Sequence, residues 1–286
     1  MSAPSPSILW FRQDLRLQDN PALHAALERG GPVLPVYILD DAGEGAWAAG
    51  GAARWWLHHA LASLDATLRA RRSRLLCFRG DAGQVLGGLA TRTGARAVFW
   101  NRRYEPAVIA RDTRLKAELT RAGLEVRSSN AALLHEPHTI TNKQGRPFQV
   151  FTPFWRHCLT LPVDAPLVLP AGRPIPGPAA WPAAPGLGEL GLLPRIRWDA
   201  GLAETWTPGE AGAARRLRQF IDGAMSAHAA RRPLPSEAGP AMRSPGLHPG
   251  ELAPRPRWRA VEDVGRPAGL FPPGNGARVF LSEVGW

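Results

Sequence analysis

Four charged residues of alternating sign follow the first apolar run of the chain: Arg12, Asp14, Arg16 and Asp19. The run before them, residues 8–11, has the length and composition of a buried strand, and Asn20-Pro21 carries the signals that begin a helix. The loop after the first strand of an open α/β sheet is a common place for ligands. Guanidinium and carboxylate groups there could bind a charged ligand, or they could pair with one another and cap the helix. The sequence leaves both interpretations open.

The elements that must position this loop alternate between short apolar runs and segments of helical period. Five runs predict strands, at residues 8–11, 33–39, 74–78, 97–100 and 124–127. Four segments predict helices, near residues 21–29, 50–71, 82–94 and 106–122. Strands that alternate with helices of this length indicate a parallel sheet covered on both faces. We therefore predict an α/β fold, with a Rossmann-like five-stranded parallel sheet flanked by helices.

Beyond this sheet the chain changes in character, which suggests three parts: an α/β domain at 1–130, a connector at 131–205, and the start of an α-helical domain at 206–286. The connector holds an aromatic cluster around Phe148 and Trp155, which we expect to pack against the first domain, and then a proline-rich tract. A helix is predicted to begin near residue 207, with Thr207 as its N-cap, Pro208 at its first position and Glu210 three after the cap. After about residue 230 the prolines exclude a long helix, and we expect loops or partial disorder.

Composition sets limits on partner and compartment. The 286 residues carry a formal net charge of +11, which favours a polyanionic partner such as DNA, although an arginine-rich composition bias would produce the same charge. Cys77 and Cys158 lie far apart, and their spacing predicts neither a disulfide nor a metal site; in its apolar run Cys77 suits the role of a small hydrophobe. The chain has no signal-peptide pattern and no apolar run of about 18 residues. We expect a cytoplasmic, monomeric protein without a membrane segment.

The stretch from Ser7 to Leu23 resembles the N-terminal signature of the DNA photolyase and cryptochrome family. Further blocks resemble the family in the expected order, at residues 100–106, 151–155, 206–211 and 244–252. The resemblance implies that the α/β domain holds a light-harvesting antenna chromophore. It also implies that a helical domain holds FAD, which donates an electron to a pyrimidine dimer in DNA.

The resemblance places the antenna at the carboxyl edge of the sheet, with a lining carried over by position: Arg12, Tyr37, Leu39, Asp40, Arg54 and Glu105. These residues supply an aromatic wall, a carboxylate acceptor and cations for an acidic tail. The alternative for Arg54 and Glu105 is a surface ion pair. Tyr104-Glu105-Pro106 resembles the deazaflavin pattern, whereas binders of methenyltetrahydrofolate tend to carry a polar pair where this chain has Ala107 and Val108. We therefore favour deazaflavin slightly.

The flavin site departs from the family. The block whose hydroxyls and amides hold the FAD diphosphate contains Pro240 and Ala241 here, and His228 stands where a tyrosine is expected. Arg232 and Ser244 still match. Losing two or three charge-assisted hydrogen bonds, each worth on the order of 1.5–3 kcal/mol, would weaken FAD binding by several powers of ten.

The last residues resemble part of the lesion pocket. Glu283 and Trp286 match the family's Glu that hydrogen-bonds the flipped bases and the Trp that stacks on them. Because most of the helical domain would follow these positions, we expect light-dependent repair of cyclobutane pyrimidine dimers as the family activity, with little of it in this chain by itself. Two alternatives are a stand-alone antenna-binding module and a cryptochrome-like photosensor without repair activity.

Overall fold

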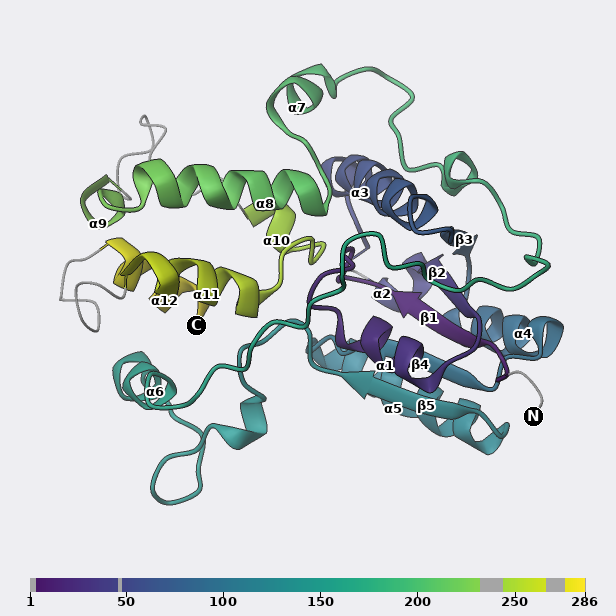
Figure 1. Ribbon diagram of the computed structural model, residues 1–286, viewed down its shortest axis with the longest axis horizontal. Helices are drawn as coiled ribbons and strands as arrows, with labels where there is room; N and C mark the ends of the chain where they lie inside the picture. The colour runs from purple at the N-terminus through teal and green to yellow at the C-terminus, as the bar shows by residue number, and fades with distance from the viewer. Residues whose placement is uncertain (1–3, 46–47, 232–243, 266–275, 286) are drawn as a thin grey trace.

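Five parallel strands form the sheet predicted from the apolar runs, and the computed structural model describes residues 4–45, 48–231, 244–265 and 276–285 (Figure 1). The strand order is β3-β2-β1-β4-β5. The strand bounds are β1 (Ser7–Phe11), β2 (Val33–Leu39), β3 (Leu76–Arg79), β4 (Ala97–Asn101) and β5 (Glu125–Ser129). Trp10 pairs with Val36 on one side and with Trp100 on the other. The three central strands therefore end together at one edge of the sheet.

Two pairs of helices cover the sheet. Side chains at alternate positions of β1 enter separate apolar clusters: Leu9 and Phe11 pack with α1 (Pro21–Arg29) and α3 (Gly51–Arg69), and Ile8 and Trp10 pack with α4 (Ala82–Thr93) and α5 (Pro106–Arg121). A strand buried on both faces is the expected consequence of a parallel sheet between helical layers. The α/β fold class is confirmed.

Local signals set most of these bounds, and a short helix, α2 (Asp41–Glu44), is an addition to the prediction. The side chain of Asn20 accepts a hydrogen bond from Leu23 N at 3.1 Å, as expected for an N-cap, and Pro21 occupies the first position of α1. The side chain of Asp40 caps α2 in the same way, by accepting from Gly43 N at 2.8 Å. β2 therefore ends directly in a helical turn that carries three acidic residues.

The proline-rich tract lies along the sheet domain. Four of its apolar side chains enter the cluster beneath α1 and α3: Leu169, Ile175, Leu190 and Leu192. Backbone bonds fix its path, including Val33 N to Pro176 O at 2.6 Å and Ile175 N to Arg71 O at 2.9 Å. The tract contains η3 (Leu187–Leu190), and α7 (Ala200–Thr205) follows it.

The aromatic cluster of the connector packs on the other side from the prediction. Trp155 of α6 (Phe151–Cys158) belongs to a third apolar cluster, with Phe220, Trp258 and Phe280 from the C-terminal helices. Figure 1 shows α6, with the turn η2 (Pro137–Thr139) before it, on the side of the molecule that holds these helices. The expectation that the aromatics pack against the first domain was wrong, because their apolar partners come from the C-terminal helices.

The C-terminal helices begin later than Thr207. α8 (Glu210–Gln219) has Gly209 as its N-cap residue, and the φ of +108° at Gly209 interrupts any helix started at Pro208. The carboxylate of Glu210 accepts from Leu17 N and Gln18 N, both at 2.9 Å, and so forms no capping box with Thr207. The predicted N-cap was wrong, and the proposed capping carboxylate instead ties α8 to the opening loop.

Regular structure also continues past residue 230, contrary to the prediction. A π-helical turn, η4 (Phe220–Ala224), follows α8. The described residues after it hold four helices: α9 (His228–Arg231), α10 (Ser244–Leu247), α11 (Pro254–Gly265) and α12 (Gly276–Val284). In α11 the prolines 254 and 256 occupy the first turn, where no intrahelical N–H donor is needed. In the described parts of the chain no helix is both long and apolar enough to cross a membrane.

Candidate functional site

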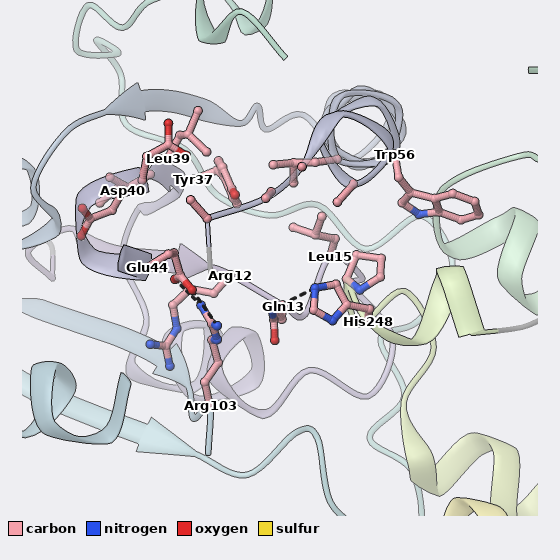
Figure 2. A pocket seen from close by; sticks show the side chains of 18 of the residues that line it. Arg12, Gln13, Leu15, Tyr37, Leu39, Asp40, Glu44, Trp56, Arg103 and His248 are labelled. Carbon is pink, nitrogen blue, oxygen red and sulfur yellow. Dashed lines mark hydrogen bonds and ion pairs between the residues drawn. The ribbon is translucent and has the colours of Figure 1, made fainter. Parts of the chain in front are cut away.

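A cavity of about 540 Å³ opens at the carboxyl edge of the sheet, above the ends of β1 and β2 (Figure 2). Tyr37 and Leu39 line it from β2, and the first turns of α3 contribute small residues and Trp56. Segments from the second half of the chain complete the wall with Trp206 and His248. The volume lies within the usual range for pockets that hold a small organic molecule.

Aromatic side chains form much of the wall. Trp56 and Trp206 meet edge to face, with ring centroids 5.5 Å apart. Trp10 forms another part of the lining, with the guanidinium of Arg12 4.7 Å from its ring centroid. Burial raises the pKa of the Tyr37 phenol, so this side chain stays neutral at physiological pH. The lining suits a flat, conjugated ligand.

Charged side chains gather where β2, α2 and the loop after β4 meet. Arg103 donates to both carboxylate oxygens of Glu44 and, at 2.8 Å, to Glu105 Oε1. Figure 2 shows Arg103 and Glu44 joined at the lower side of the cavity. Arg111 of α5 lies 3.6 Å from Glu44 and 3.9 Å from Asp40. The site therefore presents arginines that are already oriented by carboxylates.

These contacts determine the protonation of the pair at Arg103. Burial opposes the charge of Arg103, but its hydrogen bonds to Glu44 and Glu105 outweigh burial and raise its pKa. Burial also opposes the charge of Glu105, and the bond from Arg103 outweighs it, so the pKa of Glu105 is lowered. Both groups stay charged at neutral pH.

Four of the six residues carried over for the antenna line this cavity: Arg12, Tyr37, Leu39 and Asp40. Arg54 points elsewhere, because it donates to Asp41 at 2.7 Å and to Ala49 O at 2.8 Å. Glu105 reaches the cavity only through Arg103. Both residues therefore take part in ion pairs, as the alternative expected, but Arg54 pairs with Asp41 and Glu105 with Arg103 and not with each other.

Sequence reasoning missed several lining residues. Glu44 belongs to the unpredicted helix α2, and Arg111 lies on a helix whose exposed face gave no signal of function. Trp56 had the period of a core residue, and the positions of Trp206 and His248 depend on how the second half of the chain folds back. Arg103 was part of a motif that resembles the family, and that motif was the available signal.

The opening charges join the two halves of the chain. Arg16 is 2% exposed and donates only to main-chain oxygens, including Gly250 O at 2.8 Å and Ala131 O at 2.7 Å. Asp19, also buried, forms an ion pair with Arg255 of α11 at 2.8 Å. Asp14 accepts a hydrogen bond from the Arg12 amide. Asp14, Arg16 and Asp19 therefore have structural roles, although these three described residues form no ion pairs with one another as the alternative interpretation expected. Arg12 both lines the cavity and pairs with Asp112.

Gly250 lets the two halves approach closely. Its φ is +67°, and a Cβ at this position would come within 2.0 Å of Gln13 O. Pro249 O beside it accepts a hydrogen bond from Leu15 N at 3.0 Å. The chain around Gly250 thereby closes the cavity next to His248.

Of the residues carried over for FAD and the lesion, His228 and Glu283 have side chains in the described part of the chain. Buried His228 lies 3.5 Å from Glu283 and packs against Phe220 and Phe280 in the helical cluster. Neither His228 nor Glu283 lines the cavity at the sheet edge. Arg232 and Trp286 lie outside the described residues, as does the side chain of Ser244. The described residues also hold no cluster of three or more His, Cys, Asp or Glu side chains suited to a metal ion.

Comparison with known proteins agrees with the fold and the motifs. The family model described as DNA photolyase matches residues 7–174. The deoxyribodipyrimidine photo-lyase of Agrobacterium fabrum is 41% identical over 99% of this chain and 57% of its own length. Cryptochrome-1 of Arabidopsis thaliana is 39% identical over 89% of this chain and 37% of its own length. A solved structure of a bacterial class III photolyase from Agrobacterium tumefaciens covers the whole chain with a TM-score of 0.91 and 41% identity, and 58% of that protein is matched. The chain thus spans about half the length of these relatives. By its matched model and these identities, it belongs to the DNA photolyase family.

Proposed function

We propose that this chain binds a light-harvesting chromophore in the cavity at the carboxyl edge of the sheet, as the antenna part of a photolyase-type system that acts on pyrimidine-dimer DNA. The observation that carries the proposal is the cavity itself, which combines an aromatic wall with arginines held by carboxylates. An antenna needs a shielded site that fixes a conjugated ring system, and it needs no catalytic group.

The lining fits such a ligand in detail. Trp10 and Arg12 each carry a buried N–H group, Nε1 and Nε, that has no hydrogen-bond acceptor among the described residues. Ring carbonyls of a conjugated ligand are suitable acceptors for such donors. Arg103 and Arg111 lie on the same side of the cavity and suit an acidic tail. When bound, the chromophore would supply light absorption, and the protein would supply orientation and exclusion of water.

Deazaflavin is the preferred ligand, with methenyltetrahydrofolate as the alternative. The preference rests on Tyr104-Glu105-Pro106 and on the apolar pair Ala107 and Val108. Glu105 accepts a hydrogen bond from Arg103, which lines the cavity. Glu105 would therefore act on the ligand indirectly, by orienting Arg103.

We propose repair of dimers by FAD electron transfer only for a photolyase-type system that supplies a flavin site. In this chain His228 and Glu283 lie against each other, and His228 packs on Phe220. We propose that the isolated chain has little repair activity. We further propose that its net charge of +11 supports weak, salt-sensitive binding to DNA.

Absorption spectroscopy of the purified chain tests the proposal. Stoichiometric binding of added 8-hydroxy-5-deazaflavin, with loss of affinity in Arg103→Met, would support it. Stoichiometric FAD with bands near 370 and 450 nm, together with dimer splitting under blue light, would refute the assignment of an antenna-only role. If neither deazaflavin nor methenyltetrahydrofolate binds, the antenna proposal fails.

A cryptochrome-like photosensor is the second candidate, favoured by the 39% identity to Cryptochrome-1. The two candidates share the chromophore and differ in the response to DNA. Mobility shift with ultraviolet-treated and untreated DNA separates them: a repair-type chain should prefer the treated DNA, whereas a photosensor should show only the salt-sensitive binding common to both.

A further inference from the structure

One buried carboxyl, that of Glu251, lies behind the wall of the cavity. Its side chain comes from the segment between α10 and α11 and is 1% exposed. A single oxygen, Oε1, accepts two hydrogen bonds, from Trp56 Nε1 at 2.8 Å and from Gly209 N at 2.7 Å. These donors come from α3 and from the residue before α8, so this oxygen joins three separate parts of the chain.

One donor lines the cavity, and the other ends a segment that carries a second lining residue. Trp56 lines it directly, and Figure 2 shows its indole at the end of α3 nearest the second half of the chain. Gly209 ends the short segment that carries Trp206, whose ring packs edge to face on Trp56. Glu251 therefore fixes the orientation of one aromatic wall residue and the backbone that presents the other.

The second oxygen of Glu251 has a different environment. Oε2 is buried and has no hydrogen-bond partner among the described residues. The small cavity beside it is lined by Trp56, Trp206, Thr207, Ala213, Arg216, Gly246, Leu247, Glu251 and Leu252. Arg216 of α8 is the cation in this lining, and its guanidinium lies 4.2 Å from the Trp206 ring centroid and donates to Thr205 O. The nearest titratable neighbour in the chain, His248, faces Gln13 at 3.4 Å.

No cation of the described chain forms an ion pair with Glu251. Two N–H donors on a carboxylate are charge-assisted and stronger than the same bonds to a neutral group. Burial raises the pKa of Glu251 to about 7, although the bonds from Gly209 and Trp56 oppose this rise. The strength of the contact thus changes with pH near neutrality.

We propose that Glu251 is a positioning residue for the chromophore cavity, whose carboxylate holds Trp56 and Trp206 in the wall, so that ligand binding tightens when this group is charged. The role rests on the proposed function in so far as the cavity binds a chromophore. Glu251 lies outside the cavity, but its charge, which changes with pH, would control the position of the two tryptophans in the wall.

Binding of 8-hydroxy-5-deazaflavin and of methenyltetrahydrofolate to the full chain at pH 6, 7 and 8 tests the proposal. Wild-type protein should bind its preferred probe roughly three- to fivefold more tightly at pH 8 than at pH 6, because the charge-assisted bonds strengthen. Glu251→Gln keeps an oxygen acceptor for both donors and should bind with the same affinity at all three values. Glu251→Ala removes the acceptor and should lose roughly tenfold or more at each pH.

Glu189→Ala is the matched control. This exposed carboxylate also accepts a backbone bond, from Gly186 N at 2.7 Å, but in η3 and away from the cavity. Its affinity and pH profile should equal those of the wild type. Equal affinities for wild type and Glu251→Ala, or the same pH profile for wild type and Glu251→Gln, would overturn the role of Glu251. If the alanine variant does not fold, the glutamine variant decides.

Ligand-free protein provides a measurement that does not depend on the proposed function. The difference in near-ultraviolet circular dichroism between wild type and Glu251→Gln should change between pH 6 and 8, since the environment of Trp56 changes only in the wild type. If wild type binds neither probe, the antenna proposal fails but this titration still tests the contact. Tryptophan spectra that coincide at every pH would show that Glu251 does not control the wall.

Discussion

Substitution of Gly250 by alanine should show how much the close contact between the Gly250 segment and the opening loop contributes to the stability of the protein. A Cβ at this position would lie 2.0 Å from Gln13 O and 2.6 Å from Gln13 C, both main-chain atoms that cannot rotate away. The φ of +67° is itself unfavourable for alanine, by roughly 1–2 kcal/mol. Relief of the overlap requires the Gly250 segment to move away from the opening loop.

That movement would break contacts on both sides of Gly250. Arg16 donates to Gly250 O at 2.8 Å, and Leu15 N donates to Pro249 O at 3.0 Å. A buried hydrogen bond from a charged donor is worth about 1.5–3 kcal/mol. Together with the backbone strain, Gly250→Ala should lower the free energy of unfolding by about 3–5 kcal/mol. This is a large part of the roughly 5–15 kcal/mol that stabilises a typical domain.

Equilibrium unfolding in urea, followed by circular dichroism, measures the effect. At an m-value of about 2 kcal/mol/M, the midpoint should fall by about 1.5–2.5 M. Gly88→Ala is the control, because Gly88 is an exposed position inside α4 where an added methyl group would have nothing within 4 Å; this change should raise stability by about 0.5–1 kcal/mol. A Gly250→Ala midpoint within 0.3 M of the wild type, on the order of 0.6 kcal/mol at this m-value, would refute the close-approach argument.

Four further outcomes are expected. Arg103→Met should weaken binding of 8-hydroxy-5-deazaflavin by about 10- to 100-fold, through loss of a charge-assisted contact, as measured by fluorescence titration; unchanged affinity would remove Arg103 from the site. Arg255→Gln leaves the buried carboxylate of Asp19 without its cation and should cost about 3–5 kcal/mol in urea unfolding; a loss below about 1 kcal/mol would contradict this. Because burial raises the pKa of Cys77 to about 12, iodoacetamide at pH 8 should alkylate Cys77 only after denaturation, which peptide mass spectrometry can show. Folding raises the pKa of Glu251 from 4.5 to about 7, so the folded state binds this proton more tightly than the unfolded state. The resulting contribution to the free energy of unfolding, on the order of 3 kcal/mol, is full below about pH 4.5 and is lost as pH rises through 7. Glu251→Gln should remove this pH dependence from urea unfolding curves.

The sheet domain was predictable because local signals and burial agree there. Apolar runs of four to seven residues became parallel strands, with β1 and β4 fully buried, and Asn20-Pro21 began a helix as its side-chain chemistry requires. The same reasoning failed at Thr207, because the positive φ at Gly209 interrupts the helix there, where Gly209 N donates to Glu251. A start signal three residues long carries no information about a partner 42 positions away.

The candidate site was predictable only where one strand end supplies it. Tyr37, Leu39 and Asp40 follow one another at the end of β2, and their place at the sheet edge follows from the fold class. Trp206 and His248 reach the same cavity because the connector returns the chain to the sheet, and no periodicity reports that path. Arg54 shows the converse limit: its position in the helix was expected, but its direction is determined by Asp41 in an unpredicted turn.

The way in which Arg16 joins the two halves has a consequence for how this protein can vary. Its partners are carbonyl oxygens at positions 18, 19, 131 and 250, and every amino acid carries such an oxygen. Neighbouring segments can therefore exchange side chains freely during evolution without weakening this attachment. Variation is restricted instead at Arg16, which supplies the cation, and at Gly250, where any side chain would hold the two backbones apart.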